Sequence, residues 1–480
     1  MVVEIPFPFS LCLPNSKKNE EKQWPQIVAI IISTFAGITN GLLYSWASPF
    51  LIKITQDKVN YNITEEQASH FNTIHPMAML LVSPLFAKLP DTFGRKRTLL
   101  LISVPQIIAW LCLGFGKSVY VFYIAKILAG FCDAVFFAAM PIYVGEIAIP
   151  AVRGSWGNLL AISYYIGEFL INVIGSYCEI RSTSFICIPL PMMFLVLFSM
   201  MPESPYFYLM RGEEEKARES LIFLRRTTNI EAAFTQLKAD VARQMSESGT
   251  WKDLFKIKSN RKALTAGIFL RFSQQMSGMI VFITYTQYVF QKSGGDISHE
   301  VGSMIYTGLQ VGLNFLVLLF VVSKLSRRTS YIVSLLCTAL ILYVMATFYY
   351  IDSYTKIDLS AYKWVPISTM VIYQVFASVG ITIIPTLMLS ELFSASIKAK
   401  AMVFMVLTFG LGSFLTNYIF YYVNTLLGFF APFYVFAICN TLAGVLSFFV
   451  IPETKGKTLE EIQQLLKRGK KDVLKEETRL

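Results

Sequence analysis

Long apolar segments separated by short polar ones dominate the chain. A helix needs about twenty mostly apolar residues to cross a hydrocarbon layer of about 30 Å. Twelve segments meet this requirement, six on either side of a long polar interval. The pattern predicts an all-α membrane protein with twelve transmembrane helices in two six-helix halves. We place the spans at residues 26–50, 71–89, 98–116, 119–143, 156–176, 184–201, 263–290, 301–322, 330–350, 364–390, 399–422 and 429–451.

The spans divide the chain into five consecutive parts. Residues 202–262 are a predicted helical linker, in which EEEKARESLIFLRR (213–226) has the charge mix and apolar spacing of an amphipathic helix at the membrane surface. The other parts are an N-terminal leader (1–25), an N-terminal half (26–201), a C-terminal half (263–451) and a tail (452–480).

Composition and charge narrow the class of protein. Hydrophobic residues make up 54% of the chain and charged residues 15%, which a water-soluble fold of this length could hardly bury in one core. The formal net charge of +11 does not indicate nucleic-acid binding, because the basic residues cluster between the apolar runs. Roughly 33 of the 42 basic residues fall in the loops and tails of one side, which predicts that both termini and the linker are cytoplasmic.

We expect no enzyme chemistry, no cofactor and no metal. The seven cysteines are scattered through the apolar runs without a CxxC pair, which is typical of packing residues. The three histidines, His70, His75 and His299, lie near the ends of the predicted spans and offer little material for a catalytic centre. No phosphate-binding GxxxxGK[ST] run is present, which argues against a nucleotide-driven pump.

Corresponding loops of the two halves carry similar charged sequences. DTFGRKR (91–97) follows the second span and SKLSRRT (323–329) the eighth. PIYVGEIAIPAVRG (141–154) follows the fourth span and ELFSASIKAK (391–400) the tenth. These loops combine carboxylates with basic groups at cytoplasmic helix ends. An ion pair there could latch the two halves in one conformation and release them in another.

These loops resemble the signature loops of the sugar porter family of the major facilitator superfamily. PESPYFYL (202–209), QQMSG (274–278) and PETKGKTLEEI (452–462) extend the resemblance, which covers residues 91–462 in the family's order. Within the family the likeness is to the insect trehalose-transporter-like branch. The resemblance implies the major facilitator fold and movement of mono- or disaccharides by alternating access around a central site.

The resemblance also implies gating roles for the charged loops. In the second half Ser323 and Ser326 replace the family's acid and glycine, so we expect a weaker cluster there. The alternative is that the basic residues only anchor the loops on the cytoplasmic side. The implied gating residues are Asp91, Gly94, Arg95, Arg97, Glu146, Arg153, Glu203, Arg327, Arg328, Glu391, Lys398 and Glu453.

Polar side chains within the spans are the candidate substrate contacts, because they are expensive in hydrocarbon unless they meet a partner or a watery cavity. An amide both donates and accepts hydrogen bonds and therefore suits sugar hydroxyls. The resemblance places the amides of the QQMSG segment at the central site, with bonding between helices as the alternative. The candidate set is Gln274, Gln275, Thr284, Tyr285, Gln310, Asn314, Thr386 and Glu168.

Four positions depart from the polar pattern of the family. Ile280 stands where the family usually has Asn, and Thr386 where it commonly has Trp. Ala161 and Phe409 fall at the positions of a Gln and an Asn that are typical of glucose carriers. The preferred ligand therefore need not be glucose.

Two acidic residues, Asp133 and Glu168, lie within spans, where an ionisable group indicates function. One interpretation is that these acids couple transport to protons. The other is that they pair structurally with buried cations, for example in an ion network of Asp133 with Lys126 and Arg271. The first span, GITNGLLYSWASP (37–49), lacks the acid that the resemblance implies for proton-coupled members. We therefore favour structural pairing, and we expect Glu168 to face the central cavity.

The leading hypothesis is a facilitative plasma-membrane carrier of trehalose or a hexose, driven by the substrate's own gradient. The alternatives are a proton-coupled sugar symporter, a carrier of another polyol or organic solute, and a non-transporting sugar sensor, which the short basic tail disfavours. The expected partners are the sugar and the lipid bilayer, and we expect the monomer to function. Asn62 begins a glycosylation sequon in an outer loop, and Gly380 with Pro385 predicts a broken tenth span.

Overall fold

The computed structural model describes residues 22–86, 88–246, 249–294, 297–318, 326–455, 457 and 459–467. Most of the predicted leader, Ser323 and the end of the tail lie outside the described residues. Helices run through the described chain, and no strand occurs among its described residues. The predicted all-α class is confirmed.

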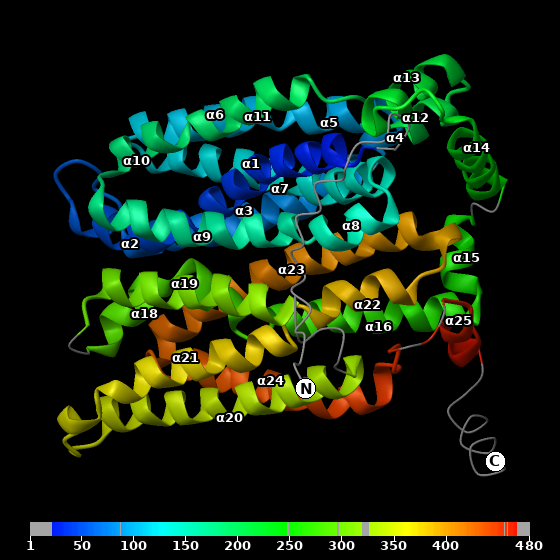
Figure 1. The fold of residues 1–480 in the computed structure, drawn as a ribbon. Helices are drawn as coiled ribbons and strands as arrows, with labels where there is room; N and C mark the ends of the chain where they lie inside the picture. Colours follow the sequence, from blue (N-terminus) through cyan, green and yellow to red (C-terminus); the bar gives the residue numbers. More distant parts are fainter. Residues whose placement is uncertain are drawn as a thin grey trace, which may run out of the picture.

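Helices occupy all twelve predicted spans, and Figure 1 shows them roughly parallel in two adjacent groups. The first group contains α1 (Trp24–Ser45), α2 (Ala47–Gln56), α3 (Glu65–Phe86), α5 (Arg95–Leu101), α6 (Ser103–Phe115), α7 (Val119–Ile147), α8 (Pro150–Trp156), α9 (Leu159–Tyr177), α10 (Ile180–Cys187) and α11 (Pro189–Ser199). The second group contains α16 (Lys258–Gln275), α17 (Met279–Thr284), α18 (Thr286–Ser293), α19 (His299–Leu316), α20 (Arg327–Tyr354), α21 (Trp364–Val379), α22 (Ile384–Leu392), α23 (Ala395–Leu427) and α24 (Ala431–Val450).

Shorter helices gather at one end of the bundle, which we call the linker end (Figure 1). The predicted surface helix is present there, but its apolar side packs on protein: Ala217 and Leu221 are buried with Ile230 and Phe234. The predicted contact of this side with the membrane surface is therefore corrected. The short helices are α4 (Leu89–Phe93), α12 (Pro205–Met210), α13 (Glu214–Arg225), α14 (Glu231–Ser246), α15 (Trp251–Lys256) and α25 (Leu459–Lys467).

Nine helical segments in the described chain are long and apolar enough to cross a membrane by length and composition alone. The spans that fall short are α3, the α16–α18 series and α19. These three bury polar side chains inside the bundle, among them Asn72, Gln274 and Gln310. The mean hydropathy of these three spans is therefore low because the side that faces the interior of the bundle is polar.

Helix α19 shows this arrangement clearly. Val301, Ile305 and Leu316 are exposed on its outer side, as expected for a surface in contact with lipid. This is the reverse of an amphipathic helix in a soluble protein. Its buried residues are small or polar: Gly302, Ser303, Tyr306, Thr307, Gln310 and Asn314.

Helix α3 begins at Glu65, earlier than its predicted span of 71–89. The start is capped, because the Thr64 hydroxyl accepts from the Gln67 N–H (3.2 Å) and the Gln67 side chain accepts from the Thr64 N–H (3.1 Å). His75 consequently lies well inside the helix and is buried. The prediction that the histidines lie near span ends is wrong for His75.

The seventh and tenth spans are interrupted. Helix α16 ends at Gln275 and α17 begins at Met279, with Gly278 between them in the left-handed region at a φ of +88°. Helix α21 ends at Val379 and α22 begins at Ile384. The predicted break in the tenth span is confirmed.

Glycines bring α1 and α9 into close contact. A Cβ atom on Gly41 would lie 2.1 Å from the Tyr164 carbonyl oxygen, and one on Gly167 would lie 2.2 Å from the Ile38 carbonyl oxygen. Such small residues let helix backbones approach closely in a membrane. Because Glu168 follows Gly167, this contact also fixes the position of that carboxylate.

Candidate functional site

The Gln274 side chain connects the break in the seventh span to the break in the tenth span by hydrogen bonds. Its Nε2 donates to the carbonyl oxygens of Ile381 (2.8 Å) and Thr382 (3.2 Å), and its Oε1 accepts from Arg271 Nη1 (2.9 Å). The side chain is only 3% exposed. Both amide donors are thus used within the protein, so in this conformation Gln274 holds the tenth span at its break.

Gln275 retains unused hydrogen-bonding capacity. Its Oε1 accepts from Ser413 Oγ (3.1 Å) and its carbonyl oxygen accepts from Thr416 Oγ1 (3.0 Å), which joins α16 to α23. Its Nε2 is buried without a partner in the part of the chain described. A buried donor left unpaired is costly, and a ligand oxygen would remove that cost.

Gln310, Asn314 and Glu168 lie together where α9 of the first half meets α19 of the second. Gln310 Nε2 donates to Glu168 Oε2 (3.1 Å), and Asn314 Nδ2 donates to the Gln310 carbonyl oxygen (2.9 Å). The side-chain oxygens of Gln310 and Asn314 have no hydrogen-bond donor among the described residues. These free acceptors would suit hydroxyl donors.

Thr284 and Tyr285 lie farther from the linker end and join the halves. The Thr284 carbonyl oxygen accepts from Asn72 Nδ2 (3.3 Å), and the Tyr285 hydroxyl donates to the Ser69 carbonyl oxygen (3.4 Å). Two further bonds link α1 to α17 and α9 to α18: Ser45 Oγ to the Ile283 carbonyl oxygen (3.1 Å) and Gln287 Nε2 to Ser176 Oγ (3.1 Å).

Asp133 forms a buried polar cluster with residues of two other helices. Its Oδ2 lies 2.7 Å from His75 Nε2 and accepts from the Tyr164 hydroxyl (3.1 Å). Lys126 instead donates to a carbonyl oxygen of α1 (2.8 Å). The predicted ion network is therefore wrong in its contacts, since Asp133 pairs with His75 and Arg271 contacts Gln274.

Two tyrosines near this cluster, Tyr44 and Tyr164, were not among the residues predicted from the sequence. The Tyr44 ring centroid lies 5.1 Å from that of His75 and 5.8 Å from that of Tyr164. Aromatic residues are common in membrane spans, so nothing in their spacing sets these two tyrosines apart. The capping pair at the start of α3 was the one available signal, because it moves His75 into the span.

Arg271 contacts two positions at which the chain departs from the family pattern. Its Nη1 donates to Thr386 Oγ1 (3.3 Å), and its guanidinium carbon lies 5.9 Å from the Phe409 ring centroid. Thr386 is exposed and Arg271 is partly exposed.

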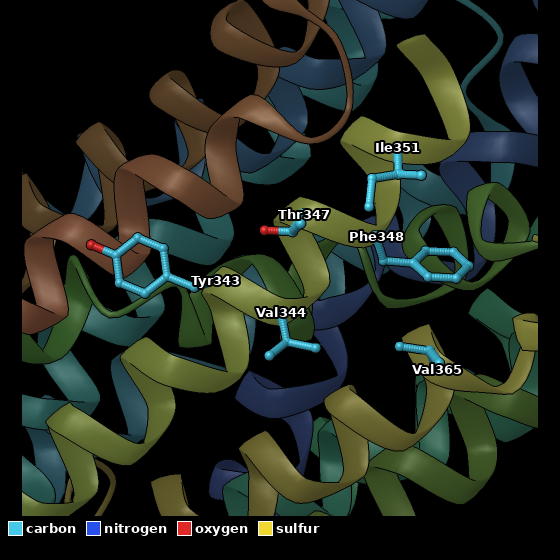
Figure 2. A pocket seen from close by; sticks show the side chains of 6 residues that line it. All are labelled: Tyr343, Val344, Thr347, Phe348, Ile351 and Val365. Atoms are coloured by element: carbon cyan, nitrogen blue, oxygen red, sulfur yellow. The ribbon is translucent and has the colours of Figure 1, made fainter. Parts of the chain in front are cut away.

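A surface recess between α20 and α21 is a poor candidate for a sugar. Figure 2 shows the side chains around it, most of which are apolar. Thr347, one of its few polar groups, is hydrogen-bonded to the Tyr434 hydroxyl (2.9 Å). The recess is lined by Tyr343, Val344, Thr347, Phe348, Ile351 and Val365.

The first charged cluster is centred on Arg95, whose side chain is 3% exposed. Its Nε and Nη2 lie 2.9 and 3.0 Å from the two oxygens of Glu146, and Nη2 also lies 3.0 Å from Asp91 Oδ1. Glu203 accepts from the Lys96 N–H at the start of α5 (2.9 Å). The carboxylate thus stabilises the positive end of that helix.

Three other predicted gating residues surround this cluster. Gly94 has a φ of +104°, and a Cβ atom there would lie 2.3 Å from Glu203 Oε2, so the turn requires glycine. Arg97 and Arg153 are exposed, and Arg153 donates to the Gly145 carbonyl oxygen (3.3 Å). No ion pair of Arg97 or Arg153 occurs among the described residues.

The second charged cluster has a similar plan with a longer ion pair. Arg327 Nη2 lies 3.4 Å from Glu391 Oε1, and Glu391 Oε2 accepts from Thr454 Oγ1 (2.5 Å). Glu453 accepts from the N–H groups of Arg327 (3.0 Å) and Arg328 (3.1 Å) at the start of α20. Glu453 therefore occupies the place in this half that Glu203 occupies in the first.

Each of these ion pairs lies within one half of the molecule. Arg95 and Glu146 both belong to the first group of helices, and Arg327 and Glu391 to the second. The pairs therefore fasten loops to their own half and do not themselves bridge the halves. Lys398 is exposed at the start of α23.

Glu453→Gln is expected to reduce the sensitivity of the fold to acid. Burial raises the pKa of Glu453, but hydrogen bonds from Ser326 and from the N–H groups of Lys455, Arg327 and Arg328 outweigh it and hold the pKa below its usual value. The resulting stability is present above the unfolded pKa of about 4.3 and is lost as the pH falls through the lower folded value.

The measurement is the Tm of the purified protein at neutral pH and at stepwise lower pH. At neutral pH the Tm of wild type should be higher than that of Glu453→Gln, and the two Tm values should converge below about pH 4. A constant gap in Tm between the two proteins across this range would contradict the assignment.

Asn62 lies in the loop between α2 and α3, at the end of the bundle opposite the linker end. It is exposed and has a φ of +44°, a conformation that asparagine tolerates better than most residues. The side chain of this sequon residue is accessible.

Comparison with known proteins identifies related sequences. The family model described as "Sugar (and other) transporter" matches residues 27–466. The facilitated trehalose transporter Tret1 of Drosophila mojavensis is 31% identical over 446 residues, which are 92% of this chain and 51% of that protein. The protein of the same name from Polypedilum vanderplanki is 29% identical over 446 residues, 92% of this chain and 88% of its own. The chain thus spans about half the length of the Drosophila relatives it matches.

Solved structures share the fold. The xylose transporter XylE from E. coli, in a partially occluded inward open conformation, matches with a TM-score of 0.75 at 18% identity, covering 91% of this chain and 100% of that chain. The proton:xylose symporter XylE bound to 6-bromo-6-deoxy-D-glucose matches with a TM-score of 0.72 at 20% identity, covering 93% and 100%. This likeness confirms the predicted twelve-helix fold.

Proposed function

Because this chain belongs to the family of sugar and other transporters, we propose that it carries a carbohydrate across a membrane by facilitated transport. The predicted resemblance to the sugar porters is thereby confirmed. The relatives described above are named facilitated trehalose transporters, which supports trehalose or a hexose as the solute.

The observation that carries the proposal is the set of unused polar groups inside the bundle. Gln275 keeps a free donor, and Gln310 and Asn314 keep free acceptors, all of them buried. They come from helices of the second half, and Gln310 contacts Glu168 of the first half. A polyol that both donates and accepts hydrogen bonds would pair these groups.

The proposed mechanism is alternating access by two halves, residues 26–201 and 263–451, that rock about the central site. We place the linker end in the cytoplasm, in line with the distribution of basic residues. The hydrogen bonds of Ser45, Asn72 and Tyr285 then close the extracellular end in this conformation. The charged clusters keep each half rigid as it moves.

This orientation places the loop with Asn62 outside the cell, where the side chain can accept a glycan. It also places the described part of the tail in the cytoplasm. The plasma membrane is the proposed location, and no chemical step beyond binding and release is involved, since the solute gradient supplies the driving force.

The test is uptake of labelled trehalose and glucose into oocytes at mildly acidic and neutral pH. We expect saturable uptake that does not depend on pH. Glu168→Gln should weaken the apparent affinity up to roughly tenfold, because the amide replaces one of the two carboxyl oxygens beside Gln310 by a donor, and a buried hydrogen bond contributes about 0.5–1.5 kcal/mol. The pH profile should stay flat.

Glu300→Gln is the charge-matched control, because Glu300 is a partly exposed acid in the first turn of α19, beside His299 and away from Gln310. Uptake by wild type that rises on acidification, and loses this rise in Glu168→Gln with affinity intact, would contradict facilitated transport. Absence of uptake of either sugar by protein present at the surface would contradict the choice of solute.

A further inference from the structure

Arg271 is a cation inside the bundle with no acidic partner among the described residues. The acidic side chains deep in the spans are engaged elsewhere, Asp133 with His75 and Glu168 with Gln310. Tyr165 and Tyr331, the titratable groups beside Arg271, carry no charge at neutral pH. Ionisable residues within membrane spans are rare and mark functional sites, and a partly exposed guanidinium without an acidic partner is able to pair with an anion that enters the bundle.

Within the described residues, only Nη1 and one face of the Arg271 guanidinium contact other side chains. Nη1 donates to Gln274 and Thr386, and one face lies over Phe409. Nε and Nη2 have no hydrogen-bond partner in the described chain, and neither atom is buried. The edge formed by these two nitrogens is the one that can bind a carboxylate through two parallel hydrogen bonds.

The surroundings of Arg271 add positive potential. Thr386 lies in the first turn of α22, a helix of 9 residues, where the helix dipole is positive. Phe409 is one helical turn from Ser413 on α23, and Ser413 contacts Gln275. Arg271 and Gln275, whose amide keeps an unused donor, are also four residues apart on α16 and therefore lie on one side of that helix.

We propose that Arg271 binds a carboxylate of the solute and that the substrates are acidic carbohydrates, sugars in which a carboxylate replaces a hydroxymethyl group. The inference rests on the proposed function and narrows its substrate class. The carboxylate pairs with Arg271 while the ring hydroxyls meet the amides of Gln275, Gln310 and Asn314. A neutral sugar fills the second set of contacts and leaves the charge unpaired.

The experiment measures equilibrium binding to the full chain in phosphatidylcholine nanodiscs. The probes are D-glucuronate, its neutral methyl ester and D-glucose, which share a ring and differ in charge. Charged hydrogen bonds contribute about 1.5–3 kcal/mol, so glucuronate should bind roughly ten- to a hundredfold more tightly than either neutral probe. Added salt should reduce this difference.

Two variants assign the difference to Arg271. Arg271→Gln should abolish the preference for glucuronate while keeping glucose binding within about threefold, and Arg271→Lys should retain part of the preference. Lys356→Gln, which removes an exposed cation in a loop far from the central site, is the control and should bind like wild type.

Each contrary result identifies what fails. Equal affinity of wild type for glucuronate and its ester, with glucose bound, would overturn the inference and leave the proposed function intact. If Arg271→Gln weakened the binding of glucose and of glucuronate equally, Arg271 would serve only to hold α22 in place through Thr386, and the inference would also be overturned. Competition by phosphatidylserine in the nanodisc would assign the site to a lipid headgroup and overturn the substrate class. Failure of wild type to bind any sugar would overturn the proposed function itself.

Discussion

Leucine in place of Gly41 is expected to prevent assembly of the first six-helix half. A Cβ atom at this position would lie 2.1 Å from the Tyr164 carbonyl oxygen and 3.2 Å from the Glu168 backbone nitrogen. Backbone atoms cannot rotate away, so α1 and α9 would have to separate. Overpacking a core by a few methylenes costs about 1–3 kcal/mol, and a leucine side chain against a backbone should exceed that range.

The measurement is the yield of monodisperse protein on size-exclusion chromatography after membrane expression, together with its Tm. Gly312→Leu is the matched control, because no atom lies within 4 Å of a Cβ placed on Gly312 of α19. The control should elute and melt like wild type. A Gly41→Leu protein that did the same would show that α1 and α9 can tolerate a wider separation.

The apolar pattern was sufficient to predict the spans, because hydrocarbon sets the length of every crossing helix. It missed the start of α3, where Glu65 and the capping pair of Thr64 and Gln67 extend the helix beyond its apolar part. The break at Gly380 and Pro385 was predictable because both residues disfavour an uninterrupted helix. Local chemistry decides these features, and local chemistry is visible in a sequence.

The partners of the charged residues were not predictable in the same way. Asp133 and Lys126 lie seven residues apart on α7, yet Asp133 pairs with His75 of α3 and Lys126 bonds to α1. The contact of Arg271 with Thr386 likewise depends on how α22 packs on α16. Spacing along one helix shows which side chains share a side, whereas the choice of partner depends on the neighbouring helix.

Methionine in place of Arg95 is expected to destabilise the first half by about 3–5 kcal/mol. Removal of one partner from a buried ion pair leaves the other charge uncompensated, and here Glu146 would remain 12% exposed without its cation. The loss should be larger than that from Asp91→Asn, because Asp91 is 54% exposed and its ion pair is screened by water.

A double-variant comparison of Tm separates this effect from a simple loss of packing. If the uncompensated Glu146 carboxylate is the cause, Glu146→Gln should restore part of the stability lost in Arg95→Met, since the amide can be buried at lower cost and still accept from Ser204. Lys88→Met, which replaces an exposed cation in the neighbouring turn, should change stability by no more than about 0.5 kcal/mol. Strictly additive losses in the double variant would mean that Arg95 stabilises the loop through its packing and its bond to the Pro90 carbonyl oxygen, and that the ion pair with Glu146 contributes little.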